Sequence, residues 1–261
     1  MTKSTITFSR KDSAKFFKTL NSRVNNYFKE NKIKRSGNWK LWIKTIVMFS
    51  IFLVPYFLIL TINMPEWLQV LFTSVMGVGM AGVGMNVMHD GNHGSFSNKK
   101  WINRIMGGSI YLLAGNRYNW QVQHNVLHHS FTNIHEHDED LNQNVMRFSP
   151  NQERKPIFRF QAYYCTLFYG LLSIFRFAVK DLQQLLRYNR IGLLKDQGLS
   201  FPARLAELIT VKSLYLAITL LIPMYLLPIA MWQTFLAFFV MHYISGLIFA
   251  YIFQPAHIIE E

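Results

Sequence analysis

Histidines are the residues of this 261-residue chain whose spacing points most directly to chemistry. His89 and His93 enclose the run His-Asp-Gly-Asn-His, and further along the chain His124 and His128 repeat the four-residue spacing, with His129 directly after them. Side chains four residues apart lie on one face of a helix, so each pair can reach a single metal ion. One such pair also arises by chance on a polar helix. Two pairs in 41 residues predict a metal centre held by imidazoles.

The residue types leave the kind of metal open. Imidazole binds zinc, copper, iron and nickel alike. The first motif lacks the glutamate of the His-Glu-x-x-His zinc proteases, and the Glu-x-x-His ligands of the ferritin-like di-iron proteins are absent as well. Five histidines exceed the three or four protein ligands of one zinc site, which favours two metal ions. The single cysteine, Cys165, excludes cysteine-based metal sites and an intrachain disulfide.

Long apolar segments predict that the histidines are positioned by membrane-spanning helices. About 20 mostly apolar residues are needed to cross a bilayer as a helix. Four segments reach this length, and very short connections join the first to the second and the third to the fourth. The fold class that follows is all-α integral membrane, with two helical hairpins and a histidine-rich helical cap. The expected spans are residues 41–63, 67–88, 213–230 and 232–253, with kinks at Pro223 and Pro228.

The distribution of charge fixes the expected orientation of these spans. The net charge of +13 is one that a nucleic-acid-binding protein could also carry, while a hydrophobic content of 51% excludes a disordered chain. Twelve basic residues lie in 3–44, fifteen lie in 99–212, and none lies in the last 49 residues. Because basic residues collect on the cytoplasmic side of membrane proteins, we expect both termini, the basic arm 1–40 and the loop 89–212 to be cytoplasmic.

The segment 160–179 is also long and largely apolar, although Arg176 interrupts it. If this segment crossed the membrane, six basic residues after it would lie on the far side, and His257 would face away from the other histidines. We therefore expect an amphipathic helix that lies in the membrane interface. Residues 105–114 are too short to span, so we expect them to be interfacial or buried.

Two features inside the expected spans have structural interpretations. His242 lies within the fourth span, where an ionisable residue is a functional candidate by default, but a neutral histidine bonded to a neighbouring helix is the favoured interpretation. The glycine-rich run 76–84 is not a phosphate-binding loop, because it lies inside a span and lacks the lysine. Small residues there favour close packing of helices.

The histidine motifs closely resemble those of the membrane fatty acid desaturases, in particular the acyl-lipid and front-end branch. The resemblance extends from about residue 41 to the C-terminus, so residues 41–261 are interpreted as a membrane desaturase domain that follows the arm 1–40. The runs that carry it are HDGNHGSFS at 89–97, QHNVLHHSFTN at 123–133 with the acidic run HEHDED after it, and FQPAH at 253–257.

The resemblance implies a function and a set of site residues. It implies an oxygen-dependent enzyme with two non-haem iron ions, which introduces a cis double bond into a long acyl chain of a lipid or of acyl-CoA. It also implies membrane lipid around the protein, an electron donor such as cytochrome b5 or ferredoxin, and no nucleic-acid partner. The metal ligands that match by motif are His89, His93, His124, His128, His129 and His257.

Acidic residues near the motifs are candidates to orient those ligands. Carboxylates often accept a hydrogen bond from the second ring nitrogen of a metal-bound histidine. Asp90 and Asp138 are the main candidates, and Glu136 and Asp140 are further ones. The alternative interpretation is that the acidic run after the second motif is a solvated loop.

The sequence departs from the family in one respect. In the family a third histidine motif follows the fourth span by several tens of residues, whereas this chain ends four residues after His257. We therefore expect the desaturase domain to be C-terminally incomplete and this chain by itself not to complete a two-iron site. Two alternative functions stay open: a related membrane di-iron hydroxylase or ketolase, and a catalytically incomplete fragment. The three residues between the paired histidines of each motif favour an acyl desaturase.

Overall fold

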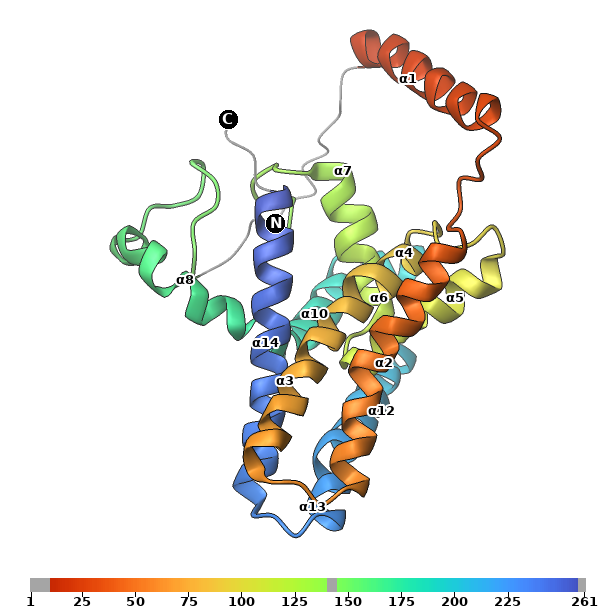
Figure 1. Cartoon of the computed structure of the whole chain (residues 1–261). Helices are drawn as coiled ribbons and strands as arrows, with labels where there is room; N and C mark the ends of the chain where they lie inside the picture. The colour runs from red at the N-terminus through yellow and green to blue at the C-terminus, as the bar shows by residue number, and fades with distance from the viewer. Residues whose placement is uncertain (1–9, 140–144, 258–261) are drawn as a thin grey trace.

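Helices and their connections make up all of the chain that the structure, a computed structural model, describes (Figure 1). The described residues are 10–139 and 145–257, with side chains for 15–139 and 145–255. The all-α fold class is therefore confirmed. The elements before the central gap are α1 (Arg10–Glu30), α2 (Trp39–Thr61), α3 (Glu66–Val83), η1 (Gly84–Met88), α4 (His89–Asn92), α5 (Lys100–Gly108), η2 (Ser109–Leu113), α6 (Arg117–Trp120), η3 (Gln121–His128) and α7 (His129–Phe131).

The second half of the chain is also helical, and α12 and α14 run alongside α2 and α3 (Figure 1). Across the described parts of both halves, several short segments are not α-helical. The π-helical ones are η1, η3, η5 and η6, and the 3-10 helices are η2 and η4. The elements after the gap are η4 (Pro156–Phe160), α8 (Gln161–Gly170), α9 (Leu172–Phe175), η5 (Arg176–Lys180), α10 (Asp181–Arg190), α11 (Leu193–Asp196), α12 (Phe201–Leu216), η6 (Ala217–Leu221), α13 (Ile222–Leu226) and α14 (Met231–His257).

Within residues 10–139 and 145–257, four helical runs are long and apolar enough to cross a membrane, which agrees with the expected number. They cover 39–61, 66–92, 201–226 and 231–255. The second run includes α3, η1 and α4, so it continues four residues beyond the expected end at residue 88 and carries His89 in its last turn.

The third run differs from the expected range 213–230 at both ends. It begins at Phe201, twelve residues earlier, because its first polar residues are paired: Arg204 bonds Glu207 at 2.6 Å. It ends at Leu226, because Leu227 is extended before Pro228, and a residue before proline disfavours the helical region. Pro228 therefore ends the helix instead of kinking it.

Helix α3 lies at the centre of the bundle, between α2 and α14. In the apolar stretch of the run 66–92, 56% of the residues are buried. The corresponding share in the other three runs is 17% to 28%. A Cβ atom on Gly79 would lie 2.4 Å from the backbone nitrogen of Phe52 in α2. One on Gly77 would lie 2.7 Å from the backbone oxygen of Met241 in α14. The glycine-rich run therefore packs helices closely, as expected.

The segment expected to lie in the interface is bent. Residues 156–170 and 172–190 form two apolar helical stretches that meet at 61°, so together they make either a broken span or a re-entrant segment. Its interfacial position therefore stays a prediction. The shorter stretch at 105–114 ends in the core, where Ile110 and Leu113 are buried.

His242 has the structural environment that was favoured for it. The side chain is fully buried in α14, and the Tyr215 hydroxyl of α12 lies 2.9 Å from its Nε2. On the other side, the Ser173 hydroxyl of α9 lies 3.0 Å from its Nδ1 and donates to its backbone oxygen. His242 thus joins three helices away from the other histidines.

The close approach of α2 and α3 generates a prediction on stability. Gly79→Ala should lower the free energy of unfolding by about 1–3 kcal/mol, because the added methyl group overpacks against the α2 backbone. The matched control is Gly108→Ala, where an added Cβ meets no atom within 4 Å. Thermal unfolding in one detergent measures both variants. Equal melting temperatures for the two variants would contradict the close contact.

Candidate metal centre

The second histidine motif lies in the π-helical segment η3, which the sequence did not reveal. The backbone N–H of His129 donates to the carbonyl of His124, five residues earlier. An α-helix has about 3.6 residues per turn, so the side chain four residues after a given residue points about 40° away from it, and the side chain five residues after points about 140° away. The wider π turn keeps both near the first residue. The rings of His128 and His129 accordingly lie 5.3 and 4.8 Å from that of His124.

The first motif also follows a π turn. The N–H of His89 donates to the carbonyl of Gly84 at the start of η1, and α4 then makes a single turn. At its end the N–H of His93 donates to the carbonyl of His89 at 3.0 Å, which places the two rings 4.4 Å apart. The expected pairing of these histidines on one helical face is therefore present.

Three histidines from the two motifs bring ring nitrogens together. Nε2 of His89 lies 3.2 Å from Nε2 of His124 and 3.2 Å from Nε2 of His93, and one ligand atom from each lies within 4.8 Å of the others. Two imidazole nitrogens bound side by side to one ion, each at about 2.1 Å, are separated by about 3 Å. The donor set and its spacing therefore fit a metal ion.

The protonation states also suit metal binding. Burial, with the neighbouring histidines, lowers the pKa of His93 to about 4. Burial and the same kind of neighbours lower the pKa of His124 to about 2. Both imidazoles are therefore neutral near pH 7, and a neutral imidazole keeps the lone pair that a metal ion requires.

The His128 ring is oriented by Asp138, one of the carboxylates predicted from the sequence to orient a histidine. Its Nδ1 lies 3.0 Å from Oδ2 and 3.1 Å from Oδ1 of Asp138, and both side chains are almost completely buried. The backbone N–H of Asn133 also donates to Oδ2 of Asp138 at 3.0 Å. This bond fixes the ring orientation and leaves Nε2 of His128 as the atom able to bind a metal.

The other proposed residues are placed less closely. Asp90 lies 3.5 Å from Nδ1 of His89, beyond the usual hydrogen-bond range. Glu136 is exposed at a turn with a φ of 67°. Asp140 lies outside the described residues. His257 ends α14, and its side chain is also outside the described part of the chain.

Asn92 joins the two motifs, a role that the sequence alone did not indicate. Its side-chain oxygen accepts from Nε of Arg117 at 2.8 Å and from Gln121 at 3.3 Å, and its amide donates to the carbonyl of Gly107. The amide of Asn125, in the second motif, donates to the backbone oxygen of Asn92. The one available signal was its place between His89 and His93.

Aromatic side chains cover the cluster. The buried Trp120 ring lies 4.6 Å from the His124 ring and 5.8 Å from the His89 ring. Phe253 of α14 lies 6.1 Å from His89. These rings limit access of water to His89 and His124. Trp120 precedes the second motif, whereas Phe253 is the first residue of the run FQPAH.

A cavity of about 640 Å³, which we call the proximal cavity, has in its wall Glu139 and Gln254, the residues next in sequence to Asp138 and Phe253. Glu139 is one of its polar lining residues. The Glu139 carboxylate accepts hydrogen bonds from Gln184 at 2.8 Å, from Arg187 at 2.7 Å and from the hydroxyl of Tyr188 at 3.0 Å. Pockets for small molecules commonly measure about 300–1,000 Å³ and have mainly apolar walls. The apolar lining residues are Val145, Met146, Phe168, Leu171, Leu172, Ile174, Phe175, Ala178, Val179 and Ala250.

Comparison with known proteins agrees with this arrangement. Residues 65–260 match a family model described as fatty acid desaturase. The chain is 28% identical to the sn-1 linoleoyl-lipid 6-desaturase of Arthrospira platensis, over 99% of this chain and 69% of that protein. It is 29% identical to the acyl-lipid (8-3)-desaturase of Physcomitrium patens, over 99% of this chain and 54% of that protein.

A third relative is the acyl-lipid (8-3)-desaturase of Mortierella alpina, with 28% identity over 94% of this chain and 56% of that protein. The chain thus spans about half to two thirds of the length of these curated relatives. No solved structure matches the chain.

The bond between Asp138 and His128 generates a prediction on metal binding. Asp138→Ala should weaken the affinity for a divalent transition metal by about 10-fold to 100-fold, because the His128 ring loses the acceptor that orients it. Competition between the purified protein and a coloured chelator for Co²⁺ measures this affinity. The control is Glu136→Ala, at an exposed carboxylate of the same loop. Equal affinities for the two variants would exclude the orienting role of Asp138.

Proposed function

The chain belongs to the fatty acid desaturase family, and from that premise we propose that it is an oxygen-dependent desaturase that forms a cis double bond in a long acyl chain of a membrane lipid. The observation that carries the proposal is the gathering of five histidine rings, from two separate segments, at the end of the second candidate span. The names of the relatives favour this reaction over a hydroxylase or ketolase and favour a lipid as the carrier.

We assign to the histidines matched by the motifs the role of ligands of a centre with two iron ions, to which a third histidine motif would contribute the remaining ligands. Bound iron would supply the oxidising power that removal of hydrogen from an unactivated acyl chain requires. The chain's own residues prepare the site: His93 and His124 are kept neutral by burial, Asp138 orients His128, and Trp120 limits access of water. The proposed ligands are His89, His93, His124, His128, His129 and His257.

The proximal cavity is the proposed binding site for the acyl chain. Its walls are mainly apolar and its volume suits a lipid chain. Its lining residue Glu139 directly follows Asp138, the carboxylate that holds His128. Lys180 and Arg187 also line this cavity, so a lipid head group would meet positive charge there. The reacting carbons of an acyl chain bound in this way would lie at the part of the cavity lined by Glu139 and Gln254.

The proposed topology is two helical hairpins with a cytoplasmic histidine-rich cap. The distribution of basic residues supports it, because 3–44 and 99–212 hold all 27 of them, and the four inside candidate spans lie in the first half of their span: Lys40, Lys44, Arg204 and Lys212. The proposed active site and both termini are then cytoplasmic. An electron donor such as cytochrome b5 or ferredoxin would approach this basic face, where positive charge favours an acidic carrier.

Helix α1 supports membrane lipid as a further partner of the basic arm. Figure 1 shows α1 apart from the helical bundle. Its apolar side chains are exposed along one face, with Phe17 at 56%, Leu20 at 43% and Val24 at 41%. Lys15 and Lys18 lie on its other faces. A basic amphipathic helix of this kind lies in the plane of an anionic membrane surface.

Expression and lipid analysis test the desaturase proposal. A host that expresses the full-length gene together with electron donors should accumulate a fatty acid with one added double bond, seen by mass spectrometry. His124→Ala should abolish this product, because the central ring of the cluster is lost. His135→Ala is the control, at a histidine outside the group that can share an ion. An oxygenated product would indicate a hydroxylase, and no product from the full-length parent would refute the proposal.

The acyl-binding role of the proximal cavity generates a separate prediction. Ala250 is buried and lines this cavity, so Ala250→Phe should reduce its volume and lower turnover of long chains more than that of short ones. Competition assays with acyl lipids of two chain lengths measure the preference. The control is Ala206→Phe, the same substitution at an exposed position of α12. An unchanged chain-length preference in Ala250→Phe would place the acyl chain elsewhere.

A further inference from the structure

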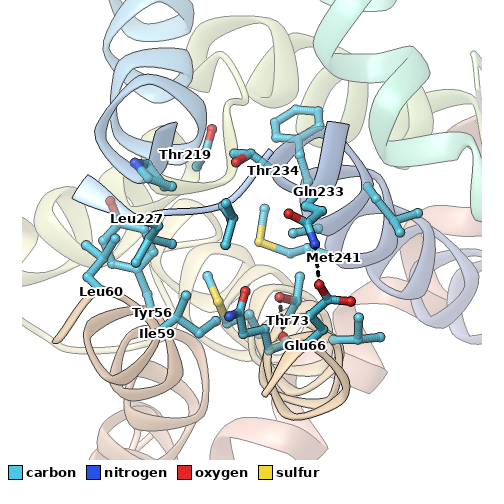
Figure 2. A pocket seen from close by; sticks show the side chains of 18 of the residues that line it. Tyr56, Ile59, Leu60, Glu66, Thr73, Thr219, Leu227, Gln233, Thr234 and Met241 are labelled. Atoms are coloured by element: carbon cyan, nitrogen blue, oxygen red, sulfur yellow. Dashed lines mark hydrogen bonds between the residues drawn. The ribbon is translucent and has the colours of Figure 1, made fainter. Parts of the chain in front are cut away.

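A second cavity lies at the end of the bundle away from the histidines, and we call it the distal cavity (Figure 2). It has a volume of about 110 Å³ and lies between α2, α3, the η6–α13 segment and α14. Met76 is the lining residue of α3 nearest to His89 in sequence, and 13 residues of helix at about 1.5 Å each separate them by about 20 Å. The distal cavity is therefore separate from the proposed active site.

The buried hydroxyl of Thr234 is the distinctive polar group of the distal cavity. Other threonines in the spans donate to the carbonyl four residues earlier: Thr73 to Gln69 and Thr219 to Tyr215, each at 2.7 Å. For Thr234 that carbonyl belongs to Ala230, which precedes the first residue of α14. Thr234 is 3% exposed, and its Oγ1 has no hydrogen-bond partner among the described residues.

The walls of the cavity are mainly apolar, and one of them includes the π-helical segment η6. The hydroxyl of Tyr56 in α2 donates to the carbonyl of Ile218 at 2.6 Å, an oxygen within the π-helical segment η6. Met76, Phe238 and Met241 line the inner part. An engineered apolar cavity of about 150 Å³ binds a benzene molecule. The distal cavity, at about 110 Å³, is somewhat smaller and suits a short segment of hydrocarbon chain.

The mouth of the cavity lies at the depth expected for a membrane interface. Trp67 and Trp232 begin α3 and α14 and are 67% and 62% exposed, and tryptophan is enriched where a span meets the head-group region. Ester carbonyls of glycerolipids occupy this region, between the head groups and the chains. Thr234, two residues after Trp232, therefore lies where such a carbonyl is available as an acceptor.

Charge at the rim selects among lipids. Glu66 is the one charged side chain among the described residues that line the cavity, and Gln233 donates to its carboxylate at 2.8 Å (Figure 2). A single negative charge at the mouth disfavours anionic head groups and accepts neutral or zwitterionic ones.

We propose that the distal cavity binds the ester-proximal segment of one chain of a neutral or zwitterionic glycerolipid from the leaflet opposite the histidine cluster, with the ester carbonyl accepting a hydrogen bond from Thr234. The bound segment lies between the rim at Glu66 and Trp232 and the inner residues Met76 and Met241. This lipid is bound as a component of the fold and does not reach the histidines. The site therefore does not depend on the proposed desaturase reaction.

Native mass spectrometry of the full chain, released from nanodiscs that contain phosphatidylcholine, measures the bound lipid. Thr234→Val keeps the shape of the side chain and removes the hydroxyl, so retention of phosphatidylcholine should fall by about fivefold, the effect of one net hydrogen bond. The matched control is Thr219→Val, which lines the same cavity but whose hydroxyl already donates to Tyr215. Retention by this control should equal that of the parent.

Two further variants keep the test decisive. Ala237→Phe fills the distal cavity and should abolish retention, and Glu66→Gln should raise retention of phosphatidylglycerol relative to phosphatidylcholine. Melting temperatures confirm that each variant is folded. Equal retention by the two threonine variants would overturn the proposal, as would unchanged retention in a folded Ala237→Phe variant. If Ala237→Phe does not fold, the threonine pair decides the outcome alone.

Discussion

The geometry of the histidine cluster depends on the hydrogen bonds of Asn92. This buried side chain lies between the two histidines of the first motif and binds Arg117 and Gln121, both of which precede the second motif. A bond from a charged donor contributes about 1.5–3 kcal/mol, and a neutral one about 0.5–1.5 kcal/mol. Because Asn125 also donates to its backbone oxygen, the two segments are tied together by the protein itself. The imidazoles are therefore held near one another by groups that do not bind metal.

Local backbone geometry determines which histidines enter the cluster. Two π-helical segments are involved: one leads into His89 and the other contains His124 and His128. A regular α-helix would bring His124 together with His128 but would direct His129 to another face. The π turn brings both, which explains how two adjacent residues take part in one site. Such turns occur frequently at functional sites because they rearrange side chains without ending the helix.

The sequence predicted the parts of the fold that follow from composition over long segments. Four spans were foreseen because about 20 apolar residues are required whatever the surrounding structure. The start of the third span at Phe201 was missed, since Arg204 and Glu207 resemble a loop until their pairing is seen. In the same way, the spacing of the histidines predicted a metal site, but it assumed α-helical turns.

Contacts between distant segments could not be predicted from the sequence. Asp138 was a main candidate because it is acidic and close to the second motif, but Glu136, which is exposed, and Asp90, which lies 3.5 Å from His89, were candidates on the same grounds. Asn92 gave no chemical signal of its own, since asparagine is neither a usual iron ligand nor a catalytic base. Its partners Arg117 and Gln121 are 25 and 29 residues away in the chain, and only folding brings them to it.

Two consecutive acidic residues connect the histidine cluster to the wall of the proximal cavity. Asp138 turns toward His128, while Glu139 turns away from it and binds Gln184, Arg187 and Tyr188 of α10. Gln184 also donates to Gln123, the residue before His124. Buried hydrogen bonds therefore join α10, which lines the cavity, to both parts of the second motif: to Gln123, the residue before His124, and to Glu139, the residue after the carboxylate that holds His128.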